Sequence, residues 1–158
     1  MFFKYLIFNE NAISLSLPYN NQEILNFFLS REGIKINMNM FQECSQLTKI
    51  KVPKYVKKIG MNTFANCSSL IEVTFEEPSS LLFISSYSFK NCKWLKRITI
   101  PSKVLMIGKN AFQNCTSLTE ISIPHSVTKI ESHTFANCRS LKQISIPSSV
   151  TEIGEGAF

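Results

Sequence analysis

The feature that most constrains this chain is a phenylalanine that recurs at nearly constant intervals. The series is Phe41, Phe64, Phe89, Phe112, Phe135 and Phe158, with steps of 23, 25, 23, 23 and 23 residues. A cysteine follows three residues after each of the first five, at Cys44, Cys67, Cys92, Cys115 and Cys138. Leu, Ile, Pro and Val keep the same phase, so a unit reads F-x-N-C-x-S-L-x-x-I-x-I-P-x-S-V-x-x-I. A repeat of this length predicts stacked units that bury one continuous core, each against its neighbours.

The spacing within a unit predicts its local structure. Ile121 and Ile123 alternate with polar residues, as in a short strand with one buried face. The proline that follows cannot donate to a strand ladder and ends the pairing. Gly60, Gly108 and Gly154 are expected to supply turns with positive φ. The stretch AFQNCTSL is expected to make a tight bend containing a turn of helix.

The segments IPSSVTEIGEGAF and CTSLTEISIPHSV resemble the BspA-like leucine-rich repeats of bacterial surface proteins and parasitic protists. The resemblance covers residues 41–158. It implies an α/β repeat solenoid, a right-handed leucine-rich repeat with a parallel β-sheet on its concave face. Short turns, 3-10 or helical, would lie opposite the sheet. The family resemblance also implies binding and adhesion as the function, at a cell surface or in a secreted protein.

Residues 1–40 do not match the repeat. ISLSLPYN, residues 13–20, looks like a degenerate strand-proline unit, and residues 20–33 have the apolar spacing of a short helix that ends at Gly33. We therefore expect an N-terminal cap over residues 1–40 and repeats over 41–158. The sixth unit is truncated at Phe158, and we expect its open end to continue into, or pack on, further repeats.

The five cysteines are interpreted as structural core residues. Equivalent residues of stacked parallel strands lie about 4.8 Å apart with parallel Cβ directions, which is unfavourable for a disulfide. A straight file of sulfurs cannot surround a tetrahedral zinc ion. Five equivalent cysteines also argue against one special nucleophile. We thus predict reduced, buried thiols, with no metal and no cofactor. Asn66-Cys67-Ser68 and Asn114-Cys115-Thr116 match the glycosylation sequon, but the asparagine recurs without it and is interpreted as a turn residue.

Side chains that flank the buried strand residues should point out from the sheet and form a ligand face. The candidates are Lys49, Lys51, Glu72, Thr74, Lys96, Arg97, Thr99, Glu120, Ser122, Gln143 and Ser145. Four of them, Thr74, Thr99, Ser122 and Ser145, form a column of small hydroxyls that would let a partner approach closely. An equally good interpretation is that Thr and Ser are tolerated on an exposed strand and bind nothing.

Charge and motif content narrow the function classes. The whole positive excess behind the net charge of +6 lies in residues 41–110, which hold eleven basic and four acidic side chains. These basic residues lack interleaved aromatic side chains, so nucleic-acid binding is not favoured. No phosphate-binding glycine loop and no converging carboxylates occur, which argues against an enzyme. No apolar stretch is long enough to predict a membrane span, and the first residues make a poor signal peptide.

The sequence therefore favours a non-enzymatic module that binds a protein or glycoconjugate. An intracellular scaffold or structural spacer, with a cytoplasmic location, is the alternative.

Overall fold

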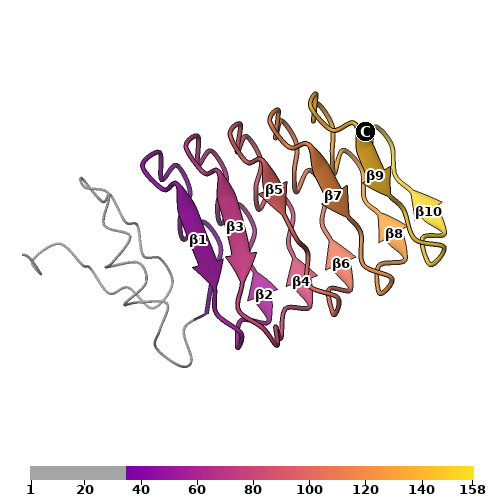
Figure 1. Ribbon diagram of the computed structural model, residues 1–158, viewed down its shortest axis with the longest axis horizontal. Coiled ribbons are helices and arrows are strands. Elements are labelled where there is room, and N and C mark those ends of the chain that lie inside the picture. The colour runs from indigo at the N-terminus through magenta and orange to yellow at the C-terminus, as the bar shows by residue number, and fades with distance from the viewer. Residues whose placement is uncertain (1–34) are drawn as a thin grey trace, which may run out of the picture.

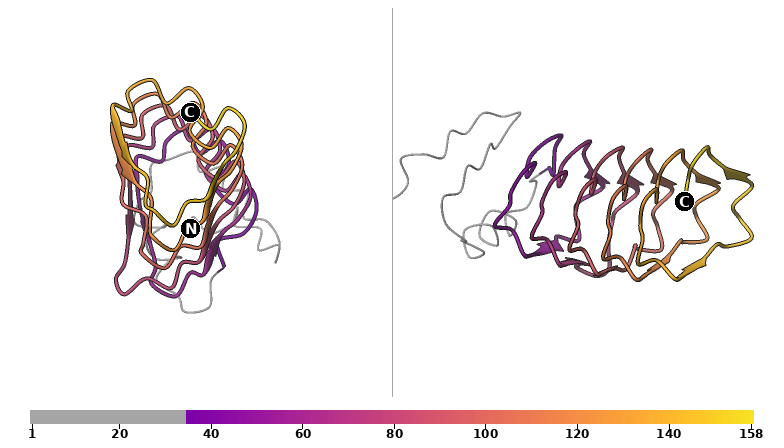
Figure 2. Two further views of the ribbon diagram at one scale, coloured as in Figure 1. Left: turned by 90° about the vertical axis from the view of Figure 1, so that its right-hand side faces the viewer. Right: turned by 90° about the horizontal axis from the view of Figure 1, so that it is seen from above.

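The computed structural model describes residues 35–158, which form a stack of coils with ten short parallel strands (Figure 1). The predicted cap over residues 1–40 lies outside the described residues, apart from residues 35–40. Figure 2 looks along the stack and shows successive coils lying one behind another. The predicted parallel-sheet solenoid with repeats of 23 residues is confirmed.

Each complete coil contributes one strand to each of two sides. One side is a five-stranded parallel sheet in the order β1-β3-β5-β7-β9. Its strands are β1 (Lys49–Val52), β3 (Glu72–Phe75), β5 (Arg97–Ile98), β7 (Glu120–Ser122) and β9 (Gln143–Ser145). The other side holds a three-stranded sheet, β2-β4-β6, and a two-stranded sheet, β8-β10. These strands are β2 (Lys58–Ile59), β4 (Phe83–Ile84), β6 (Met106–Ile107), β8 (Lys129–Ile130) and β10 (Glu152–Ile153). The register pairs equivalent repeat positions throughout, for example Ile50 with Val73.

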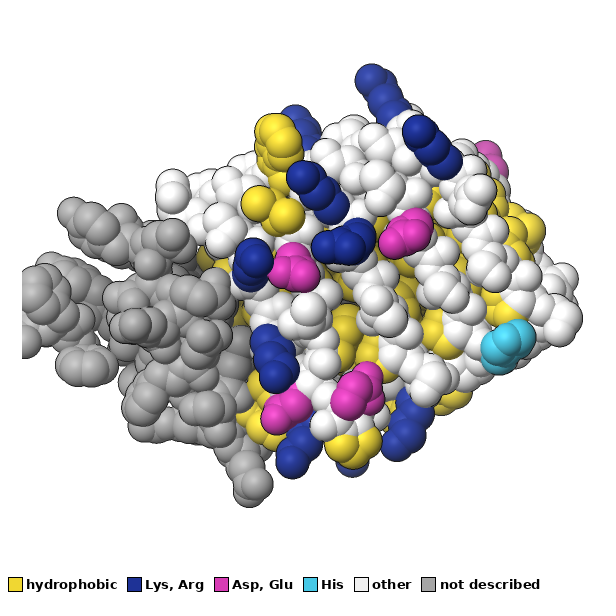
Figure 3. Space-filling model, viewed as in Figure 1, with side chains coloured by type: hydrophobic (Ala, Val, Ile, Leu, Met, Phe, Trp, Pro, Cys, Tyr) yellow, Lys and Arg dark blue, Asp and Glu magenta, His cyan; other side chains and the backbone are white. Residues whose placement is uncertain are grey.

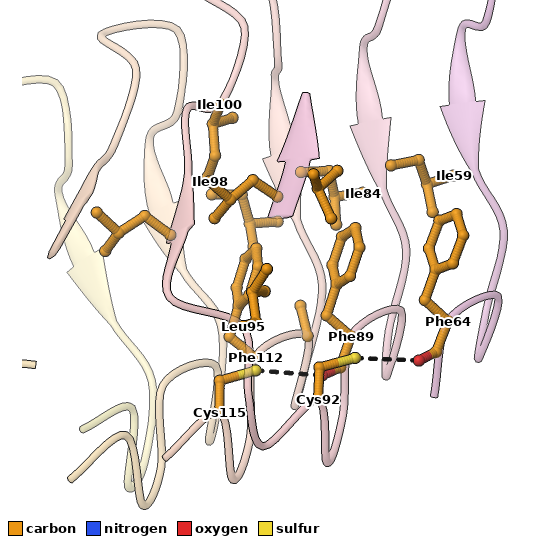
Figure 4. Close-up of a cluster of buried hydrophobic side chains, with 14 of the residues drawn as sticks. Ile59, Phe64, Ile84, Phe89, Cys92, Leu95, Ile98, Ile100, Phe112 and Cys115 are labelled. Carbon is orange, nitrogen blue, oxygen red and sulfur yellow. Dashed lines mark hydrogen bonds between the residues drawn. The ribbon is translucent and has the colours of Figure 1, made fainter. Parts of the chain in front are cut away.

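The recurring phenylalanines form a continuous stack through the core. Phe64 and Phe89 lie with ring centroids 5.2 Å apart and planes 9° from parallel. The same arrangement runs from Phe41 to Phe158, with centroid distances of 5.2–5.8 Å. Figure 4 shows three of these rings in a row, with Cys92 and Cys115 beside them. Offset ring stacking adds to the energy of apolar burial, so one position per repeat stabilises every interface between coils.

The expected helical turn is wrong, because the described residues contain no helix. The FxNC segment is a tight turn whose main chain bonds to the next coil. The N–H groups of Phe64 and Asn66 donate to the carbonyls of Ser88 and Lys90, both at 2.8 Å. Asn66 has a φ of 64°, in the left-handed region. A residue there interrupts a right-handed helix, and donors used between coils are unavailable for helical hydrogen bonds.

Asparagine at this turn has a second role. The side-chain amide of Asn91 donates to Oδ1 of Asn66 at 2.7 Å, and Asn114 donates to Asn91 at 2.7 Å. Asn137 continues the series to Asn114 at 2.9 Å. Asparagine is therefore favoured both for its tolerance of positive φ and for a side chain that bonds to its own copy. Attachment of a glycan to Asn114 would disrupt this ladder.

The expected positive φ at three glycines is also wrong. Gly156 is the only glycine of residues 35–158 with positive φ, at 57°. Gly60, Gly108 and Gly154 are required instead by close approach of the preceding coil. A Cβ on Gly108 would lie 2.5 Å from the main-chain nitrogen of Ser86. The repeat thus uses glycine where two coils touch through their backbones.

Cys67, Cys92, Cys115 and Cys138 are free, buried thiols, and Cys44 is partly buried. Each buried thiol donates to the carbonyl of a phenylalanine in the preceding coil: Cys92 to Phe64 at 3.1 Å and Cys115 to Phe89 at 3.2 Å (Figure 4). Cys67 and Cys138 do the same at 3.0 and 3.1 Å. Burial holds the thiol pKa values of Cys92 and Cys115 well above the ordinary value and raises that of Cys138 to about 11.

The first prediction concerns the glycine contacts. We expect Gly108→Ala to lower the free energy of unfolding by about 1–3 kcal/mol, because the new methyl group overlaps a backbone. Ser85 occupies the equivalent position one coil earlier and has a buried hydroxyl without a hydrogen-bond partner. Ser85→Ala should therefore be neutral or stabilising. Urea unfolding of both variants tests this, and equal destabilisation would contradict it.

The second prediction separates the two roles of asparagine. Asn114→Ala should cost about 1–2 kcal/mol, since it loses both the left-handed preference and the amide bonds. Asn114→Gly should cost less, because glycine tolerates the same φ of 61°. If both variants unfold at the same urea concentration, the positive φ at Asn114 does not contribute to the preference for asparagine.

The third prediction is a loss of stability at alkaline pH. The unfolded thiols ionise from about pH 8.5, whereas the buried thiols keep their protons, so the native state binds more protons above this pH. Stability should be unaffected at lower pH and fall as pH rises towards the folded pKa values, by about 1.4 kcal/mol per pH unit for each buried thiol. Urea unfolding under a reducing agent measures the slope. A Cys92→Ala, Cys115→Ala variant should show a shallower slope; an unchanged one would contradict the account.

Candidate functional site

The predicted ligand residues all lie along the outer surface of the five-stranded sheet. Ten of the eleven are exposed, and Glu72 is partly exposed. Eight of them line one shallow groove of about 550 Å³: Glu72, Thr74, Arg97, Thr99, Glu120, Ser122, Gln143 and Ser145. Lys49, Lys51 and Lys96 do not line this groove. We call this surface, made of the eleven predicted residues, the sheet face; a ligand for it remains a prediction.

One column of the sheet face alternates in charge. The register places Lys49, Glu72, Arg97, Glu120 and Gln143 side by side on successive strands. Lys49 Nζ lies 3.2 Å from Glu72 Oε2. Figure 3 shows basic and acidic side chains alternating across this face. Neighbouring opposite charges cancel much of each other's field, so this column presents a pattern of charges rather than one sign.

The adjoining column consists of small, neutral side chains after its first residue, Lys51. Lys51 is followed by Thr74, then by Thr99, Ser122 and Ser145. Thr74 Oγ1 lies 3.5 Å from the carbonyl oxygen of Ile50, a weak hydrogen bond to the preceding coil. Short side chains here leave the groove shallow and expose hydroxyl donors and acceptors to a partner.

Neither a metal site nor a reactive thiolate is supported by the part of the chain that is described. Residues 35–158 contain no cluster of three or more His, Cys, Asp or Glu that could hold a metal ion. The buried thiols bond to carbonyls, and their raised pKa values disfavour the reactive thiolate. Residues 35–158 also contain no helix long and apolar enough to cross a membrane.

Sequence reasoning missed a second surface, on the opposite side of the coils. Leu105 and Met106 at β6 are 49% and 41% exposed, and Leu82 and Phe83 at β4 are partly exposed. In other units these repeat positions hold Lys, Thr or Glu, so the consensus gave no sign of an apolar cluster. The sequence signal for this cluster was that two consecutive units, with Leu82-Phe83 and Leu105-Met106, are apolar at both positions.

Solved structures similar to this chain are bacterial leucine-rich repeat proteins. A leucine-rich cell surface protein from Faecalibacterium prausnitzii A2-165 is 33% identical, with a TM-score of 0.58 over 78% of this chain and 39% of that one. One from Eubacterium ventriosum ATCC 27560 is 26% identical, with a TM-score of 0.68 over 77% of this chain and 32% of that one. The T. pallidum leucine-rich repeat protein, 23% identical, shares the fold with a TM-score of 0.62, over 80% of this chain and 70% of that one.

No curated protein shows significant similarity to this chain. The chain spans less than half the length of two of the three solved proteins described above. Residues 34–158 match the BspA type leucine rich repeat region in six copies, which covers the whole of the described solenoid. The chain therefore belongs to the BspA-type leucine-rich repeat family.

Proposed function

We propose that this chain is a non-enzymatic binding module that recognises a protein or glycoconjugate through its sheet face. Leucine-rich repeats are typically protein-interaction modules. In the proposed arrangement the solenoid is right-handed and the sheet face is its concave side. The observation that supports this most directly is the single groove that eight of the predicted residues line together.

The chemistry of the groove fits a polar ligand. Its outer side chains are hydroxyls, one amide and charges of both signs, and apolar side chains contribute only from beneath. Such a surface binds through hydrogen bonds at fixed spacing, with bridging water where the fit is loose. Extended peptides and glycans both present polar groups of this kind. We place the module in a cell-surface or adhesive protein, as the solved surface protein of Faecalibacterium prausnitzii suggests.

A scaffold or spacer role inside the cell is the second candidate. The observation that favours it is the ion pair between Lys49 and Glu72, since charges paired within the face are less available to a ligand. Immunofluorescence of a tagged full-length protein, on intact and permeabilised cells, separates the two. Staining only after permeabilisation would reject the surface role.

The fourth prediction tests the sheet face itself. Ser122→Glu places a longer, charged side chain in the middle of the groove, and Arg97→Glu breaks the alternation of charge. Each should weaken binding to a glycan or surface-protein array at least tenfold, about 1.4 kcal/mol.

The matched control is Arg139→Glu, which makes the same charge change on an exposed turn after Cys138. This variant should bind as the unaltered chain does. Equal loss in all three variants, or binding that survives both groove substitutions, would reject the sheet face as the ligand site.

A further inference from the structure

The side of the solenoid opposite the sheet face has an exposed apolar cluster. Leu82 and Phe83 from one coil lie beside Leu105 and Met106 from the next: the register pairs Phe83 with Met106, and the Leu105 N–H donates to the Leu82 carbonyl at 2.8 Å. Leu105 is 49% exposed and Met106 is 41% exposed. We call these four residues the β4–β6 surface. Contiguous exposed apolar side chains of this kind mark interaction sites in soluble proteins.

Lysines border this surface without acidic partners. Lys57 and Lys58 occupy the positions of Leu82 and Phe83 in the preceding coil. Lys58 pairs with Phe83, and the Lys57 carbonyl accepts a hydrogen bond from the Leu82 N–H at 2.9 Å. Lys103 and Lys109 lie on the same coil as Leu105. The segments 53–63, 78–89 and 101–112, which form this side of three coils, contain no Asp or Glu. In residues 35–158, only Lys49 and Lys129 form ion pairs.

The next two coils show the contrast. At the position of Met106 they have Lys129 and Glu152, whose charged groups lie 2.8 Å apart. At the position of Leu105 they have two threonines, Thr128 and Thr151. In these two coils the outer columns are thus polar and charge-balanced. The apolar, cationic character is confined to the coils that hold β2, β4 and β6.

We propose that the β4–β6 surface and its bordering lysines bind an acidic segment of a partner protein that also carries apolar side chains. Unpaired lysines around apolar residues complement carboxylates around an apolar anchor. A second copy of this chain would bring the same cationic surface against itself. A bilayer is disfavoured because Leu82 and Phe83 are only partly exposed, which leaves little apolar surface to insert. This site is separate from the sheet face.

The fifth prediction uses a defined probe. A fluorescent random copolymer of glutamate and tyrosine should bind the full chain at least about tenfold tighter than polyglutamate of equal length, because only the copolymer has apolar anchors. Leu105→Ser and Lys58→Glu should each weaken copolymer binding about tenfold or more. Fluorescence anisotropy measures affinity, and thermal unfolding verifies that each variant folds.

The matched controls are Trp94→Ser and Lys93→Glu, which make comparable changes at exposed positions outside the β4–β6 surface. Both should bind the copolymer normally. Equal affinity for polyglutamate, or equal losses in the control variants, would overturn the proposal by showing unspecific attraction. So would Leu105-dependent binding to phosphatidylserine vesicles or RNA without copolymer binding, or a dimer in sedimentation that Leu105→Ser dissociates.

Discussion

The structure depends on main-chain hydrogen bonds between successive coils. They run through the sheets and continue through the turns, where Phe64 and Asn66 donate to the next coil at 2.8 Å. These bonds hold equivalent residues at one strand spacing, about 4.8 Å. A side chain that repeats must therefore interact favourably with the neighbouring coil. Phenylalanine does so by offset ring stacking and asparagine by amide bonds, while cysteine fits as a small buried donor to the neighbouring backbone.

This constraint explains why the period alone predicted most of the fold. Phe89, Leu95 and Ile98 repeat in phase and are buried, as the consensus required. The errors concern backbone conformation. Local propensity predicts helical turns at the NC positions and a positive φ at Gly108, because propensity takes no account of the neighbouring coil. The neighbouring coils decide both: the next coil accepts the turn's N–H donors, and the preceding coil leaves no room for a Cβ on Gly108.

The two outer surfaces differed in how far they could be predicted. The alternation within a single unit was enough to identify Thr99 and Ser122 as outward-facing residues. The alternating charges of Lys49, Glu72 and Arg97 required the register between strands. The β4–β6 surface also required the register between strands, because Leu82 and Leu105 are 23 residues apart and each departs from the consensus.

Stacking also keeps the two surfaces independent. The residues of an outer column change from coil to coil, as from Lys58 to Phe83 and Met106, while the phenylalanine stack in the core continues unchanged. One side presents hydroxyls and paired charges, and the other presents apolar residues bordered by unpaired lysines. Because the two sides face away from each other, a ligand on one leaves the other accessible. The two proposed sites therefore do not compete for the same surface of the solenoid.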